Sequence, residues 1–224
     1  IDSTRGRCGS RCGGNGMHAR DLQDLAVLSA ISTDFEGLCA SIHDEQWFSQ
    51  TPCTEWNLGQ LVDHVTGGNR FTVRILEGAP AEAAMAETVE SFDERHEPRA
   101  AALESIKAQL VAFDEPDLLD RLCHHVAGEM TGREVLRIRL HEMIIHTWDI
   151  GEALAPPATI RDEYVDWSFA EITNPGSNTA ELFTLDTAAL DGERTERTLL
   201  AAFGRRSSKS QDARLETRDS RCEA

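Results

Sequence analysis

The stretch from Thr131 to Leu154 places the strongest constraint on how this chain can fold. Thr131 and Glu134 have the spacing of a capping box, in which each side chain accepts a hydrogen bond from the backbone amide of the other residue at a helix start. No proline follows until the Pro156-Pro157 pair, so we expect one uninterrupted helix that ends near Leu154. At a rise of ~1.5 Å per residue, such a helix spans a small helical bundle.

Other amphipathic stretches predict further helices. Asn57 and Gln60 resemble a second capping box, and they start a predicted helix that runs to about Glu77. Apolar residues that recur every three or four positions predict additional helices from Asp21 to about Trp47, from Phe92 or Pro98 to Phe113, from Asp162 to Ile172 and from Arg194 to Phe203. An Ala- and Glu-rich connection is expected after Gly78-Ala79-Pro80, and a linker with a short extended piece from Leu118 to Met130.

Long amphipathic helices separated by helix breakers are typical of an all-α fold, here an up-and-down four-helix bundle with additional short helices. A length of 224 residues with 40% hydrophobic content suits one domain with a substantial core. We assign that domain to residues 17–206. Residues 1–16 and 207–224 are polar and lack a sustained apolar period, so we expect both tails to be disordered.

The net charge of the chain limits the kinds of partner that we expect, and its hydropathy and cysteines indicate its cellular location. A net charge of -17 disfavours nucleic acid and anionic membrane surfaces as partners. No apolar run approaches the ~20 residues that cross a bilayer, and the amino-terminal stretch lacks the apolar centre of a secretory signal. We therefore expect a cytoplasmic protein without membrane contact, whose six cysteines are reduced thiols: Cys8, Cys12, Cys39, Cys53, Cys123 and Cys222.

A metal site is predicted within the long helix. Glu142 and His146 are four residues apart, so both side chains lie on one helix face and can converge on one cation. His64 points inward from the preceding capped helix and is the best third ligand. Two imidazoles and one carboxylate leave a fourth position open on zinc, as in catalytic zinc sites.

Each of these residues also has a simpler interpretation. An inward histidine such as His64 is often a hydrogen-bonded core residue, and Glu142 with His146 is also compatible with a solvated ion pair. Asp149 is expected to orient a ligand or the neighbouring backbone. Asn69 and Arg70 lie one to two turns beyond His64, where they face either a ligand cleft or solvent. His141 points elsewhere on its helix, and the His124-His125 pair is expected to be exposed, so the three are left out of the site.

Three motifs together resemble a known family. They are Thr51-Pro52-Cys53-Thr54-Glu55-Trp56 with His64, then Gly67-Gly68-Asn69-Arg70-Phe71, and Glu142-x-x-x-His146-x-Trp148-Asp149. From about Met17 to about Arg206 the chain resembles the metal-binding domain of the mycothiol-dependent maleylpyruvate isomerases, within the DinB-like superfamily. The resemblance implies metal ligands at His64, Glu142 and His146, and mycothiol as the co-substrate.

The resemblance implies thiol chemistry, in which a metal holds a small thiol as its nucleophilic thiolate for attack on an electrophile. We therefore expect a thiol transferase or isomerase. The isomerases of the family carry a second, carboxy-terminal domain, for which we expect no room after Arg205, so we do not expect maleylpyruvate to be the substrate. Two alternatives remain open: a zinc hydrolase that uses a bound water, and a protein that binds or senses metal without catalysis.

Overall fold

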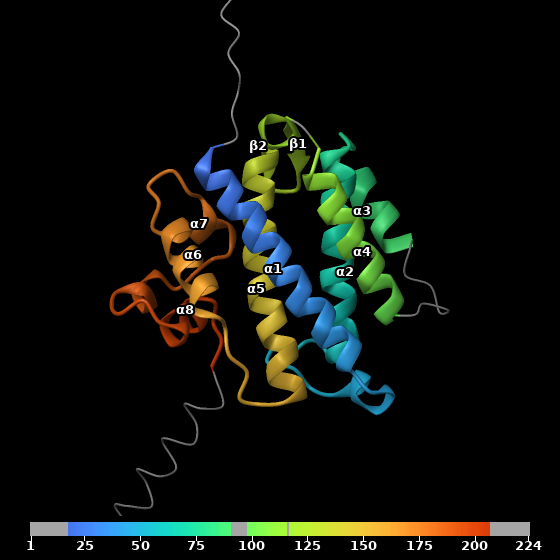
Figure 1. Ribbon diagram of the computed structural model, residues 1–224, viewed down its shortest axis with the longest axis vertical. Coiled ribbons are helices and arrows are strands. Elements are labelled where there is room, and N and C mark those ends of the chain that lie inside the picture. Colours follow the sequence, from blue (N-terminus) through green and yellow to red (C-terminus); the bar gives the residue numbers. More distant parts are fainter. Residues whose placement is uncertain (1–17, 91–97, 116, 207–224) are drawn as a thin grey trace, which may run out of the picture.

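Four long helices form the body of the protein. The computed structural model describes residues 18–90, 98–115 and 117–206, and the two tails expected to be disordered lie outside these residues (Figure 1). The long helices are α1 (Ala19–Ser41), α2 (Leu58–Leu76), α4 (Pro98–Phe113) and α5 (Gly132–Leu154). Within the bundle α2 packs against α4 and α5, and α1 packs against the same two helices. The predicted all-α bundle is confirmed.

Shorter elements surround this bundle. The helical pieces are α3 (Ala81–Glu90), α6 (Asp162–Ile172), α7 (Thr179–Leu182) and α8 (Glu196–Ala202), with single 3-10 turns at η1 (Asp44–Phe48), η2 (Leu118–Asp120) and η3 (Thr187–Leu190). Figure 1 shows α6, α7 and α8 gathered beside α1 and α5, away from α2 and α4. Among the described helices, none has the length and apolar content needed to cross a membrane.

Both predicted capping boxes are present. The Gln60 amide donates to Asn57 Oδ1 at 2.9 Å, and the Asn57 amide donates to Gln60 Oε1 at 3.0 Å. At the start of α5, the Thr131 amide donates to Glu134 Oε2 at 2.7 Å, and the Glu134 amide donates to Thr131 Oγ1 at 3.3 Å. The two helices that carry the predicted site therefore start where their local sequences specify.

The first helix ends at Ser41, earlier than the expected end near Trp47. A side chain from another helix explains the difference. Arg99, on α4, donates to the carbonyl oxygens of Cys39 and Ile42, and so satisfies acceptors that would otherwise bond to a continuing helix. The end of α1 is therefore determined by a contact that its own periodicity does not contain.

Two connections between the long helices contain regular secondary structure. The Ala- and Glu-rich connection contains α3, because both residue types are strong helix formers. The linker before α5 contains an antiparallel hairpin of β1 (Leu122–His125) and β2 (Gly128–Thr131). Gly128 has a φ of 116°, which a glycine adopts without steric cost, and so lets the chain reverse between the two strands.

The start of α5 tolerates only a glycine at position 132. A Cβ there would lie 2.3 Å from the carbonyl oxygen of Leu118, which is backbone and cannot rotate away. We expect Gly132→Ala to lower the free energy of unfolding by about 1–3 kcal/mol through overpacking. Chemical denaturation measures this change.

Gly37 provides the matched control, because a Cβ at this position in α1 meets nothing within 4 Å. Gly37→Ala should stabilise the protein by up to about 1 kcal/mol, since alanine favours the helix more than glycine does. Equal unfolding free energies for the two alanine variants would contradict the packing described for residue 132.

Candidate metal centre

The structure brings His64, Glu142 and His146 together between α2 and α5. His64 Nε2 lies 3.3 Å from Glu142 Oε2, and His146 Nε2 lies 3.4 Å from the same oxygen. One donor atom from each residue lies within 4.8 Å of the other two. Packing of α2 against α5 supplies this proximity, since 78 positions separate His64 from Glu142.

These separations fit a tetrahedral metal. Donors that each lie ~2.1 Å from one zinc ion are ~3.4 Å apart at tetrahedral angles. Both measured separations from Glu142 Oε2 match that value. The donor set of two imidazole nitrogens and one carboxylate oxygen is also one that zinc accepts. His64, Glu142 and His146 therefore fit the zinc ion that the sequence motif implies.

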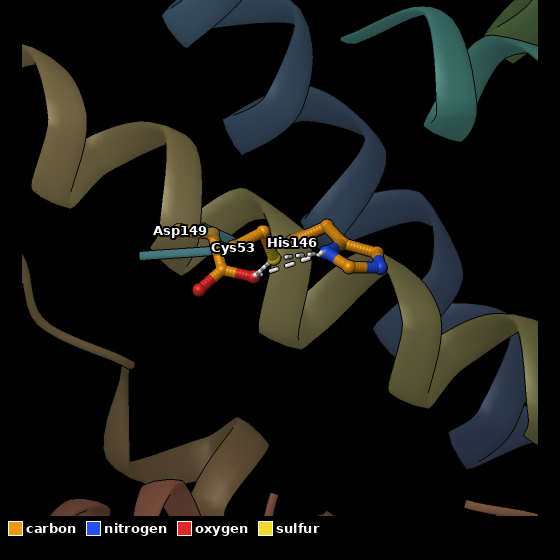
Figure 2. Close-up of side chains that lie close together, drawn as sticks. All are labelled: Cys53, His146 and Asp149. Carbon is orange, nitrogen blue, oxygen red and sulfur yellow. Dashed lines mark hydrogen bonds and ion pairs between the residues drawn. The ribbon is translucent and has the colours of Figure 1, made fainter. Parts of the chain in front are cut away.

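A second layer of contacts fixes the His146 ring. Asp149 Oδ2 lies 3.0 Å from His146 Nδ1 and accepts a hydrogen bond from the Cys53 thiol at 3.1 Å. Figure 2 shows the Cys53 sulfur and the Asp149 carboxylate on the Nδ1 side of the ring, opposite Nε2. A carboxylate that accepts from Nδ1 leaves Nε2 free to face a metal, which is the usual arrangement at histidine ligands.

Arg205 completes this layer from the far end of the domain. Its Nη2 atom lies 3.0 Å from Asp149 Oδ2 and 3.0 Å from Cys53 Sγ, and its Nε lies 3.1 Å from Asp149 Oδ1. The atoms of Cys53, His146 and Asp149 are close enough to suggest a second cation site. A guanidinium already supplies the positive charge there, so we interpret these contacts as a hydrogen-bond network.

Charge coupling within the cluster shifts three pKa values. Burial alone would raise the pKa of Glu142, but hydrogen bonds with His146 and His64 hold it well below its usual range. Burial alone would lower the pKa of His146, but hydrogen bonds with Asp149, Cys53 and Glu142 raise it well above its usual range. Burial opposes ionisation of Asp149 too, yet His146 and Arg205 lower its pKa. The contacts among Glu142, His146 and Asp149 therefore favour the charged form of each of these three groups.

The cluster opens into a cavity of about 520 Å³. Trp56 stacks on His64 with ring centroids 4.4 Å apart and forms one edge of this space. The other walls come from α2, α3, α5, the tip of the hairpin and α7. Their lining residues include Gly68, Phe71, Met85, His125, Val126, Val135, Ile138, Arg139, Leu182 and Phe183. A mostly apolar chamber thus lies directly beside the proposed ligands.

The remaining predicted residues have different surroundings. Asn69 is fully buried between helices and its side-chain oxygen accepts from Arg139 Nε at 3.0 Å, so it does not face the cavity itself. Arg70 borders a separate surface depression with Val73 and Glu87, away from the metal cluster. Neither side chain lines this cavity, although Asn69 supports a residue that does, and a ligand role for the two residues stays a prediction.

Histidines left out of the predicted site also differ in environment. His141 is buried, its ring lies 4.7 Å from that of Trp167, and burial lowers its pKa to about 4. The expectation of exposure was wrong for His125, which lines the cavity and packs on Phe71 with ring centroids 5.5 Å apart. Its Nδ1 accepts from the Ala127 amide at 3.2 Å, and burial lowers its pKa.

Sequence reasoning missed the contributions of Cys53 and Arg205. Cys53 belongs to the Thr51-Pro52-Cys53 segment that the family motif includes, so a weak signal was present. Arg205 follows the last helix without any periodicity and had no such signal. It lies 56 residues from Asp149, which explains why local spacing could not pair them.

An all-α bundle with a His-Glu-His cluster on facing helices defines a class of candidate metalloproteins. The sequence profile of the mycothiol maleylpyruvate isomerase N-terminal domain matches residues 28–151. The match covers more than half of the chain, and the chain belongs to that family.

Two further comparisons show what this chain resembles in sequence and in fold. The chain is 27% identical over 119 residues to the uncharacterized proteins MT0763 and Rv0738 of two Mycobacterium tuberculosis strains, across 53% of this chain and 60% of each relative. Crystal structures of the mycothiol-dependent maleylpyruvate isomerase and of a single-residue mutant of it superpose with TM-scores of 0.52 and 0.55. Both alignments have 16% sequence identity and cover 68% of each chain, so they establish the shared fold.

Proposed function

We propose that this chain binds one divalent ion, zinc by preference, at His64, Glu142 and His146, and that it transfers or isomerises an electrophile with mycothiol as the thiol. The observation that carries the proposal is the geometry of the three donors. They come from two facing helices, are spaced for one tetrahedral ion and open into an apolar cavity. A site with three protein ligands retains a position for a fourth, exogenous one.

When bound, the metal supplies a Lewis acid that stabilises a small thiol as its thiolate at neutral pH. Residues of the chain itself orient the metal ligands and exclude water. Asp149 holds Nδ1 of His146 and so directs Nε2 toward the site, and Arg205 holds the carboxylate of Asp149. Trp56 stacks on His64 and limits rotation of that ring. The apolar cavity walls exclude water that would compete for the electrophile.

A cytoplasmic location is part of this proposal. Cys39, Cys53 and Cys123 are free thiols, as expected in a reducing compartment. The Cys53 thiol is 3.1 Å from Asp149 Oδ2, so its oxidation to a bulkier form would disturb the carboxylate that orients His146.

Thiol titration of the cobalt-substituted protein tests the proposed function. We expect mycothiol to produce a sulfur-to-metal charge-transfer band, because the thiolate would enter the fourth position directly. The metal-loaded protein should then conjugate or isomerise members of an electrophile panel that contains epoxides, maleyl compounds and activated halides. His146→Ala should lose both signals.

The same titration separates the alternatives. A protein that only binds or senses metal would show no turnover with any electrophile. A zinc hydrolase would react with esters or amides without added thiol. If mycothiol leaves the cobalt spectrum unchanged and the panel does not react, the thiol proposal is wrong.

A further inference from the structure

A buried arginine lies in the cavity wall beside the metal cluster. Arg139 is on α5, three residues before Glu142, and is only 4% exposed. Its Nε donates to Asn69 Oδ1 and its Nη2 donates to the Val65 carbonyl, each at 3.0 Å. Both acceptors are neutral.

The surrounding structure is built to hold this guanidinium. A Cβ on Gly68 would lie 2.3 Å from Arg139 Nη1, so the side chain rests against the bare backbone of α2. Asn69 is itself fixed from α4, because its Nδ2 donates to Ser105 Oγ at 3.0 Å. Three helices therefore determine the orientation of one cation whose neighbours include Gly68 in the cavity wall.

The two acceptors that hold Arg139, the Asn69 side-chain oxygen and the Val65 carbonyl, carry no negative charge to match that of the guanidinium. Burial lowers its pKa to about 10, so the group remains cationic at neutral pH. Glu142 is the acidic neighbour that acts on it over distance, but that carboxylate already contacts His64 and His146. Asp63 also lines the cavity. With a divalent ion bound, the positive charges of the ion and Arg139 together exceed the negative charges of Glu142 and Asp63. A buried cation held by neutral acceptors is costly, and a ligand that carries a negative charge would reduce this cost.

We propose that Arg139 forms an anion subsite that binds the carboxylate of an acidic electrophile in this cavity. The apolar remainder of such a molecule would lie against walls formed by Trp56, Phe71, Val135 and Ile138. Arg139 is thus a residue that determines specificity: it selects organic acids over neutral molecules of the same shape. Binding of the acid rests on the metal site of the proposed function, and the role of that acid as the electrophile rests on its thiol chemistry.

Binding of a matched acid and amide to the zinc-loaded full chain, without thiol, tests the subsite. Cinnamate and cinnamamide share one shape and differ in charge. Calorimetry should show cinnamate bound about 10- to 100-fold more tightly, the range expected for a charge-assisted hydrogen bond in a desolvated site. Arg139→Gln should remove this preference and leave cinnamamide binding unchanged, while Arg139→Lys should retain part of it.

Three results would overturn the inference: equal affinities in the wild type, no detectable cinnamate binding at millimolar concentration, or an acid preference that persists in Arg139→Gln. The last result would mean that the metal alone binds the carboxylate. Should Arg139→Gln fail to fold, Gly68→Ala serves as the second variant, because its Cβ displaces Nη1 while the charge remains. It should also weaken the preference, and an unchanged preference would count against the subsite.

The two proposals can fail separately. Loss of the thiol-induced cobalt band with a retained acid preference would reject the thiol function and leave the anion subsite in place. A normal thiol band with no acid preference would reject the subsite alone.

Discussion

Replacing Glu142 or His146 by alanine should remove tight zinc binding. Each change deletes one of three donors, and Glu142 is the residue whose Oε2 lies 3.3 Å and 3.4 Å from the two imidazole nitrogens. Changes to residues that merely support a ligand weaken metal affinity by about 10- to 100-fold, so loss of a ligand should exceed about 100-fold. Elemental analysis after dialysis, followed by competition with a chromophoric chelator, measures the stoichiometry and the affinity.

His124→Ala is the matched control for these variants. His124 lies on the hairpin with its side chain half exposed, and it contacts Glu129 at 3.5 Å, outside the cluster. This variant should bind one zinc per chain with wild-type affinity. Full metal occupancy in both the Glu142 and the His146 variant would show that the ligands have been misassigned.

The largest effect on stability is expected at Asp24, in the interface of α1, α5 and α6. Asp24 is fully buried, and its two oxygens accept from Trp167 Nε1 at 2.8 Å and from Arg137 Nε at 2.9 Å. Arg20 contacts it as well, at 3.1 Å. Asp24→Ala would remove the acceptor of the buried Trp167 Nε1 and the direct partner of Arg137 Nε, which should lower the free energy of unfolding by about 3–5 kcal/mol.

Urea denaturation followed by circular dichroism measures the loss, with Glu129→Ala as the surface control. The Glu129 side chain is 65% exposed, so its removal should change stability by less than about 0.5 kcal/mol. Asp24→Asn should fall between the two, because the amide keeps one acceptor. A loss below about 1 kcal/mol for Asp24→Ala would mean that the network contributes no more than an exposed ion pair does.

The candidate site was predictable where its geometry is local. Glu142 and His146 belong to one helix turn, and a spacing of four residues places both on the same face before any tertiary contact is known. Apolar neighbours that recur around His64 on α2 predict an inward side chain, whereas the structure places that side chain at the cavity with 37% of it exposed. The separation between His64 and Glu142 was not predictable, since it depends on how α2 packs against α5.

The residues that support the site were not predictable in the same way. Arg139 is a polar residue at an inward position of α5, and only the absence of a side chain at Gly68 and the oxygen of Asn69 explain how it is accommodated there. Arg205 reaches Asp149 from a segment beyond the last helix. Neither contact corresponds to a periodic pattern in the sequence.

The sequence by itself determined the starts of α2 and α5, the all-α class and the three residues proposed as metal ligands. Capping boxes and helical periodicity act within about four residues, so the local chain contains all the information they require. Tertiary structure alone decided the end of α1, the cavity, the Cys53–Asp149–Arg205 network and the burial of Arg139. These features depend on contacts between distant segments, where buried polar groups must find partners that no local spacing specifies.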